Sequence, residues 1–419
     1  MANIALVCPP LPGHLNPIAN LGRALKLRGH SVTIFNLPAL EQRAKSEGLH
    51  FCPVGSQGVE ALARNIEHMA RQQGLKSLKF AVECSRQISE LLCEQLPQAL
   101  IKAEIDLVLV DQNEPAGGTV AEHLGLPFVS ICPSLPLNRE PDIPPPFFSW
   151  PFAETTASRL RNRIGYRIAD WLISPINRTI NRYRIRWGLR PLRSADDSFS
   201  PSAQLCQMTP EIDFPRQRLP STFHYLGPFC DNSGGSVPFP FDQLNGKPLI
   251  YASLGTLQDR NSAYFRVIAE ACVGFDGQLV LSLGGGDAVP FTGLPGSPLV
   301  VKYAPQLEIL ERANLTITHA GLNTVMQSLM FGVPMVAIPI THDQPGIAAR
   351  VRQSGTGEVL PVKSLTVARL RTALERVAHE PRFRARAHAQ SQSIKAAGGL
   401  VRGVKIVEEV LSKNALRDH

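Results

Sequence analysis

A histidine close to the N-terminus is placed to act as a base. Gly13-His14 follows Ile4–Cys8, an apolar segment typical of a buried strand. Imidazole has an ordinary pKa of about 6.5, so His14 can take a proton from a hydroxyl group near neutral pH. A loop histidine can equally serve as a structural hydrogen-bonding group. The residues alone leave both interpretations open.

Three junctions in the second half of the chain suit a ligand that carries phosphate and sugar. Ser253–Thr256 follows one apolar segment, and His319–Thr324 lies between another and a helical stretch. Small residues let the backbone approach a ligand, and free N–H groups at a helix start favour an anion. Asp343-Gln344 follows the next apolar segment, and its two side chains can hold sugar hydroxyls. Each junction alone can be a structural turn, but together they predict a binding site.

Parallel sheets must bring these junctions together. The opening strand, a helix from about Ile18 to Arg28 and the strand Val32–Phe35 make a βαβ unit, which Leu107–Asp111 and Phe128–Cys132 continue. A second series of apolar strands begins at 248–256. Ligands of open α/β sheets bind beyond the carboxyl ends of the strands. The sequence therefore predicts an α/β protein with two doubly wound, Rossmann-like domains that face each other across a cleft.

The domain boundaries follow from composition. The 419 residues suit two α/β domains. We expect an N-terminal domain over 1–229 and a linker rich in Gly, Pro and Ser over 230–247. A C-terminal domain should follow over 248–400, and residues 401–419 should form a helix that can pack back on the N-terminal domain. The helical pattern itself starts near Ala389 and runs to Leu411.

The positive charge is concentrated in an insertion in the N-terminal domain, around 133–200. The net charge is +8, and residues 158–190 contain nine arginines and one acid. Because the charge is local, we do not expect a nucleic-acid partner. The eight cysteines form no Cys-x-x-Cys pair, which favours free thiols over disulfides or zinc. The sequence has neither a signal-peptide pattern nor a run of about 20 apolar residues, so we expect a cytoplasmic protein.

The second half resembles the UDP-glycosyltransferases of the GT-B fold, glycosyltransferase family 1. The resemblance rests on Tyr303–Gln306, His319–Thr324, Gly332–Pro334 and Asp343–Pro345, which match the order and spacing of that family's donor signature. It implies that Tyr303 stacks on uracil and Gln306 contacts the base or ribose. It also implies that His319, Asn323 and Thr324 hold the diphosphate and that Asp343 and Gln344 grip the sugar. The full set of expected donor-binding residues is Ser253, Thr256, Tyr303, Ala304, Gln306, His319, Gly321, Asn323, Thr324, Gln327, Asp343 and Gln344.

Two positions depart from the plant form of the signature. Tyr303 stands where Trp is usual, and Gln327 replaces a ribose-binding Glu. TDP-sugar enzymes share this fold, so the nucleotide stays open.

The resemblance extends to the first half of the chain. It implies that His14 is the catalytic base and that Asp111 is its partner, although Asp111 can also be a strand-end acid that caps a helix. Val110–Gly117 and Leu135–Asp142 resemble the bacterial zeaxanthin glucosyltransferases within this family. The residues expected at the acceptor are Gly13, Asn113, Glu114, Pro136, Asn138 and Arg139.

The function implied is inverting transfer of glucose from UDP-glucose to the hydroxyl of a lipophilic acceptor such as a carotenoid. We expect no metal ion and no cofactor besides the donor substrate. Residues 158–190 can then dock on an anionic membrane surface, at the inner face of a membrane, with Trp171, Ile173, Ile176, Tyr183 and Trp187 entering the interface. The alternative is a solvated helix pair whose apolar face closes the acceptor pocket. Other functions left open are transfer to a soluble polyketide, macrolide or flavonoid, a sugar-nucleotide epimerase of the same fold, and a sugar-nucleotide sensor.

Overall fold

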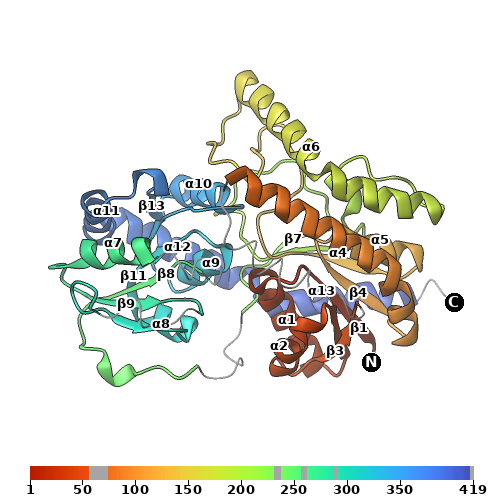
Figure 1. Ribbon diagram of the computed structural model, residues 1–419, viewed down its shortest axis with the longest axis horizontal. Helices are drawn as coiled ribbons and strands as arrows, with labels where there is room; N and C mark the ends of the chain where they lie inside the picture. Colours follow the sequence, from red (N-terminus) through yellow and green to blue (C-terminus); the bar gives the residue numbers. More distant parts are fainter. Residues whose placement is uncertain (56–73, 231–236, 256–261, 286–290, 292, 416–419) are drawn as a thin grey trace.

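The computed structural model describes residues 1–55, 74–230, 237–255, 262–285, 291 and 293–415. They form two α/β domains that lie side by side (Figure 1). The predicted fold class, two parallel-sheet Rossmann-like domains, is confirmed. Thr256 and residues 231–236 of the predicted linker lie outside the described residues.

The N-terminal domain is built on a seven-stranded sheet in the order β3-β2-β1-β4-β5-β6-β7. Every neighbouring pair is parallel. The central strands are apolar along their whole length because helices cover both faces of the sheet. The strands are β1 (Asn3–Val7), β2 (Ser31–Asn36), β3 (His50–Pro53), β4 (Leu107–Asp111), β5 (Phe128–Cys132), β6 (Gln204–Cys206) and β7 (Phe223–Tyr225).

The first helix of this domain begins earlier than the sequence suggests. Helix α1 spans Pro12–Leu27, whereas the prediction began it at Ile18. Proline is well accommodated in the first turn of a helix, so Pro12 starts α1 rather than delaying it. His14 therefore lies in the first turn of α1 and not in a loop. The other helices of the domain are α2 (Glu41–Ser46), α4 (Gly74–Lys102), α5 (Pro115–His123) and α6 (Thr156–Arg186).

The C-terminal domain has a six-stranded parallel sheet in the order β10-β9-β8-β11-β12-β13. Its strands are β8 (Leu249–Ser253), β9 (Gln278–Ser282), β10 (Leu299–Val301), β11 (Ala313–Thr318), β12 (Met335–Ala337) and β13 (Gly357–Val359). Its helices are α7 (Ser262–Cys272), α8 (Gln306–Arg312), α9 (Leu322–Met330), α10 (Gln344–Ser354), α11 (Val367–His379) and α12 (Pro381–Ala397).

The last helix of the chain crosses to the N-terminal domain. The segment predicted as helical from Ala389 to Leu411 forms parts of two helices, because α12 ends at Ala397 and α13 spans Gly399–Ala415. Gly398 has φ +89°, a left-handed conformation that ends a helix. Helix α13 then packs against α1, and Arg28 of α1 pairs with Glu408. Strand β1, which begins the chain, and helix α13 thus both lie in the N-terminal domain (Figure 1).

The basic segment forms the single long helix α6, not a helix pair. Thr155 and Ser158 cap its start reciprocally, and Pro175 lies inside it. The half before Pro175 projects beyond the rest of the molecule (Figure 1). The second half packs on the domain: Tyr183 is buried in the core between α4 and α5, and Trp187 stacks on His123.

One apolar cluster spans both domains. It joins Leu135 and Met208 of the N-terminal domain to Val325 of α9 and Ile347 of α10. Because these side chains are buried together, the two domains share a core, and the start of α10 lies against the N-terminal domain.

Candidate active site

His14 and Asp111 form a hydrogen-bonded pair at the ends of β1 and β4. Nδ1 of His14 lies 2.7 Å from Oδ2 of Asp111. The two strands are neighbours in parallel register, so the loops after them start side by side. Burial by itself lowers the pKa of His14, but the charge and hydrogen bond of Asp111, with a smaller contribution from Asp343, raise it above the ordinary value. If Nδ1–H donates to Asp111, Nε2 carries the lone pair that a base needs.

The second oxygen of Asp111 is held by Asn113. The backbone N–H and the side-chain amide of Asn113 both donate to Oδ1 of Asp111, at 2.8 and 3.2 Å. The amide also donates to Oγ of Ser134. Asp111 is fully buried, so these contacts fix which oxygen faces His14.

Glu114 lies beside this pair but is buried in the fold. It is 3% exposed, and its carboxyl accepts from the Ser89 hydroxyl of α4. Burial, with a further contribution from the charge of Asp111, raises the pKa of Glu114 to about 8, against the opposing hydrogen bonds from Ser89 and the Ala116 backbone. Glu114 is therefore mostly neutral at pH 7, and Asp111 is the charged carboxylate beside His14.

A proline in α1 links the base to the other domain. Pro17 has no N–H, so the carbonyl of Gly13, four residues earlier, lacks its helical donor. Asn323 of the C-terminal domain supplies one instead, from Nδ2 at 3.0 Å. Oδ1 of Asn323 accepts from Gln207 at 2.6 Å. The side chain of Asn323 thus joins the domains next to His14.

The diphosphate side of the site is assembled from two glycine-containing junctions. A Cβ at Gly255 or Gly321 would lie 2.7 or 2.5 Å from the ring of His319, so only glycine fits at either position. Burial lowers the pKa of His319 to about 4, which keeps the imidazole neutral. Gly321 leaves the start of α9 without a side-chain cap. The free N–H groups there, beside the buried Thr324, suit a phosphate.

The predicted nucleotide-base residues lie at the start of α8. Tyr303 is 47% exposed, and a Cβ on Gly285 would approach its hydroxyl to 2.6 Å. Gln306 accepts from the Tyr251 hydroxyl at 3.0 Å and donates to Gln327. An aromatic ring with an open face and two amides beside it suit a nucleoside. Ala304, between Tyr303 and Gln306, packs partly buried against the core.

The predicted sugar-gripping pair begins α10. Gln344 accepts through Oε1 from the backbone N–H groups of Ile340 and Thr341, both at 2.8 Å. Burial raises the pKa of Asp343, against the charges of His342 and His14. The mutual electrostatic influence of Asp343 and His14 indicates that the start of α10 lies near the proposed base.

The predicted acceptor residues after β5 mostly contact the protein itself. The carbonyls of Pro136 and Asn138 accept from Arg216, at 3.2 and 2.6 Å. The amide of the buried Asn138 donates to Gln204. Arg139 pairs with Asp170 of α6 and lies 5.0 Å over the Tyr166 ring. Among these residues, Arg139 borders a cavity of about 600 Å³ at the base of α6.

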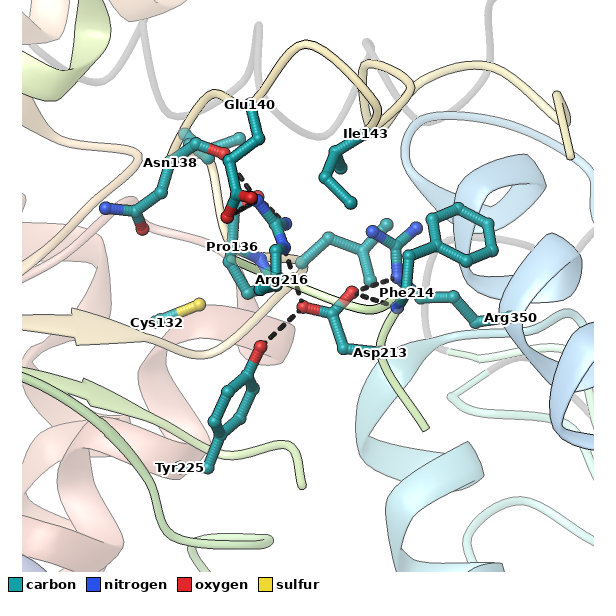
Figure 2. A network of polar contacts seen from close by, with 12 residues as sticks. Cys132, Pro136, Asn138, Glu140, Ile143, Asp213, Phe214, Arg216, Tyr225 and Arg350 are labelled. Carbon is teal, nitrogen blue, oxygen red and sulfur yellow. Dashed lines mark hydrogen bonds and ion pairs between the residues drawn. The ribbon is translucent and has the colours of Figure 1, made fainter. Parts of the chain in front are cut away.

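The sequence interpretation missed Ser134, Gln207 and the buried network around Asp213 (Figure 2). Pro17 was the available signal that the Gly13 carbonyl needs a partner outside its helix, because a proline inside a helix leaves the carbonyl four residues earlier without its helical donor. The partners of Asp213 carry no such local signal.

Comparison with known proteins agrees with this geometry. The sequence model of UDPGT, "UDP-glucoronosyl and UDP-glucosyl transferase", matches residues 30–395. The chain is 36% identical to the zeaxanthin glucosyltransferase of Pantoea ananas, over 98% of this chain and 96% of that protein. It is 34% identical to the zeaxanthin glucosyltransferase of Pseudescherichia vulneris, over 98% of each.

The fold also matches solved structures. CalG4, the calicheamicin glycosyltransferase, superposes with a TM-score of 0.76 at 20% identity, over 99% of both chains. Within the part of the chain that the structure describes, no helix has the length and apolarity to cross a membrane.

Proposed function

This chain belongs to the UDP-glucoronosyl and UDP-glucosyl transferase family and is a glycosyltransferase, and we propose that it transfers glucose from UDP-glucose to the hydroxyl of a carotenoid. The observation that carries the proposal is the hydrogen-bonded pair of His14 and Asp111, whose imidazole is also influenced by the charge of Asp343 from the other domain. A base on one side and a sugar-gripping pair on the other are what glycosyl transfer to a hydroxyl needs.

The proposed reaction is one inverting displacement. Nε2 of His14 takes the proton of the acceptor hydroxyl while its oxygen attacks the anomeric carbon of glucose. The bond from that carbon to the diphosphate oxygen breaks, and UDP leaves with the electron pair. The start of α9 and Thr324 meet the charge that develops on UDP, so the mechanism requires no metal ion. Asp111 stabilises the imidazolium that forms.

The carotenoid acceptor is proposed from the two bacterial relatives, which are named for zeaxanthin and match along nearly the whole chain. Glucose is proposed from the same names, and UDP is proposed from the family description and the exposed ring of Tyr303. A carotenoid resides in a bilayer, so the enzyme must reach a membrane surface.

We propose that the projecting half of α6 makes that contact. Leu160, Ile164, Ile168 and Trp171 are all exposed and lie at helical spacing on one face. Arg163 and Arg167 are exposed beside this stripe, where they also line the cavity that Arg139 borders, and neither has an ion pair with any described residue. An apolar stripe beside unpaired arginines suits an anionic bilayer. The earlier expectation that Tyr183 enters the interface is wrong, since that side chain is buried. Trp187 is also packed inward.

The test is transfer by the purified protein, followed as UDP release and as glucosylated product. Acceptors would be zeaxanthin in detergent, a flavonoid, a macrolide and no acceptor. We expect product with zeaxanthin and none with His14→Ala, whose affinity for UDP should stay within about threefold of wild type. Retained turnover in His14→Ala would overturn the base. Product only with the flavonoid or macrolide would overturn the carotenoid, and consumption of UDP-glucose independent of acceptor would indicate an epimerase or hydrolase.

A further inference from the structure

A buried carboxylate, that of Asp213, joins the two domains (Figure 2). Nε of Arg350, in α10, donates to Oδ1 of Asp213 at 2.6 Å. Nε of Arg216 and the hydroxyl of Tyr225 donate to Oδ2 at 3.0 and 2.7 Å. The side chains of Asp213, Arg216 and Arg350 are 0, 3 and 2% exposed. Arg350 belongs to the C-terminal domain and the other three residues to the N-terminal domain.

The network reaches the acceptor side of the cleft through Arg216. Its two terminal nitrogens donate to the carbonyls of Asn138 and Pro136. Both carbonyls belong to the segment 135–142 that follows β5. Arg216 therefore fixes the backbone of this segment to the same carboxylate that holds Arg350.

The network reaches the donor side through α10. Asp343 and Gln344 stand at the start of this helix, and Arg350 lies about two turns later on the same rigid element. Between them, Gly346 touches the N-terminal domain directly, since a Cβ there would lie 2.0 Å from the carbonyl of Pro146 and 2.9 Å from Leu135. Any shift of α10 against segment 135–146 would move Asp343 and Gln344 relative to His14.

Stability alone does not explain such a network. Burying charges costs free energy that their attraction recovers only with good geometry, and apolar replacements of equal volume are often as stable. In this network, hydrogen bonds to Asp213 hold the guanidinium groups of Arg216 and Arg350 in fixed orientations. Arg350 also lies 4.1 Å over the ring of Phe214, which defines the plane of its guanidinium. A directional link between two halves of one site is better suited to setting their distance than to adding stability.

We propose that Arg350 and Asp213 are positioning residues, which hold the sugar-gripping start of α10 in register with the acceptor segment 135–142. In this arrangement the anomeric carbon and the acceptor hydroxyl meet at His14. The inference rests on the transfer reaction proposed above. The residues predicted to hold UDP itself lie at α8, α9 and the β8 junction, so the link should affect transfer more than nucleotide binding.

The test uses Arg350→Met, which keeps the length of the side chain over Phe214 but removes its donors. Asp213 still has Arg216 and Tyr225, so no buried charge is left alone. The matched control is Arg352→Met, an exposed arginine two residues further along α10 that donates to the carbonyl of Val359. We would measure kcat and KM for transfer, the ratio of UDP-glucose hydrolysis to transfer, and the Kd of UDP by calorimetry.

We expect Arg350→Met to lower kcat at least tenfold and to raise the ratio of hydrolysis to transfer, while Kd for UDP changes less than threefold. Arg350→Lys, which keeps the charge, should recover part of the loss. If Arg350→Met and Arg352→Met have equal kcat and equal hydrolysis ratios, the inference is wrong. It is also wrong if kcat and UDP affinity fall in parallel, which would indicate only a weakened C-terminal domain.

Asp213→Asn provides a second route should Arg350→Met not fold. It keeps the hydrogen bond with Tyr225 and removes the charge that aligns both arginines. A folded Asp213→Asn with unchanged kcat would overturn the proposal. Absence of transfer in the wild-type protein would instead contradict the proposed function and is recognised before any variant is compared.

Discussion

The reactivity of His14 depends on which partner contacts each of the two carboxylate oxygens of Asp111. Asn113 occupies Oδ1 twice, which leaves Oδ2 for the imidazole. A carboxylate without Asn113 could rotate and share its charge with both partners. The neighbouring Glu114 is protonated at neutral pH and does not compete for the imidazole. Asp111, at the end of β4, together with Asn113 and Glu114 just after it, thus sets the tautomer and the basicity of His14.

Replacement of Asp111 by Asn should slow transfer and shift its pH dependence. Burial lowers the pKa of His14, and the Asp111 charge is the main influence that raises it, so Asp111→Asn should lower that pKa. A base acts when deprotonated, so the acidic limb of kcat/KM against pH should move to lower pH. The loss of imidazolium stabilisation should reduce kcat by about 10²- to 10⁴-fold.

The pH profile from pH 5 to 9 checks this expectation, with His14→Ala as the reference for a missing base. A profile of Asp111→Asn that keeps the wild-type limb would show that Asp111 does not set the basicity of His14.

Replacement of Glu114 by Gln should remove a pH-dependent loss of stability. The carboxyl has a pKa of about 8 in the folded chain and about 4.3 when unfolded. Below the pKa of the unfolded chain, Glu114 is protonated in both states, so it does not lower the free energy of unfolding. As the pH rises toward 8 the unfolded state loses its proton first, and the folded wild type is progressively destabilised, by on the order of 3 to 5 kcal/mol in full.

Urea unfolding of wild type and Glu114→Gln at pH 5, 7 and 9 measures this slope. The free energy of unfolding of the variant, relative to wild type, should increase with pH. The slope is the readout, because the offset at one pH also contains the altered contact with Ser89. Parallel curves would contradict a buried neutral Glu114.

At the scale of elements, two short helix starts do most of the positioning. Helix α1 carries the base in its first turn, and Pro17 exposes the Gly13 carbonyl to Asn323. Helix α10 carries the sugar pair at its start and meets the N-terminal domain one turn later at Gly346. In both cases a residue that weakens a regular helix creates the contact between the domains.

Replacement of Gly346 by Ala tests the contact of α10. Alanine at a helix interior usually stabilises by about 1 kcal/mol relative to glycine. Here its Cβ would overlap the Pro146 carbonyl at 2.0 Å, and such overpacking costs about 1 to 3 kcal/mol. The overlap should prevail, so Gly346→Ala should lower the Tm and reduce kcat. Gln353→Ala, on an exposed position of α10, is the control and should leave both nearly unchanged. A Tm for Gly346→Ala at or above wild type would show that the domains are not in contact there.

Strands were easier to predict from the sequence than helix starts. Leu107–Asp111 and Phe128–Cys132 are mostly apolar because both faces of the sheet are covered, and the structure places strands at those residues. The start of α1 was missed because prolines were taken as a break, although Pro12 is compatible with a first turn. The short strands β6 and β7, the last two at one side of the sheet, have only three residues each and no periodicity to detect.

At the scale of the molecule, the sequence does not predict which side chains far apart along the chain contact each other. The sequence predicts that His14 lies at a strand end, and the family resemblance supplies Asp111. It contains no local sign that Asp213 contacts Arg350, which lies 137 positions away, or that Arg216 holds the carbonyl of Asn138. Such contacts follow from the relative placement of two domains, which apolar periodicity does not specify.

The proposed contact of α6 with a membrane concerns one face of the whole molecule, and a vesicle experiment can test it. The protein should co-sediment with vesicles rich in anionic lipid at low salt and much less at high salt, because about 1 kcal/mol of attraction per arginine is screened. The double variant Arg163→Gln, Arg167→Gln should therefore bind roughly 30-fold more weakly. Ile164→Ser with Trp171→Ser should weaken binding at every salt concentration, because the loss there is of apolar contact.

The matched control changes two exposed apolar residues elsewhere, Leu27→Ser with Val401→Ser, and should bind vesicles like wild type. Neither double variant of α6 should alter transfer to an acceptor presented in detergent, because His14 and α10 are untouched. If all variants co-sediment with vesicles to the same extent, or if the wild-type protein does not bind anionic vesicles at low salt, the exposed face of α6 has another role. A selective loss of transfer to carotenoid in vesicles, with detergent activity kept, would tie this face to acceptor delivery.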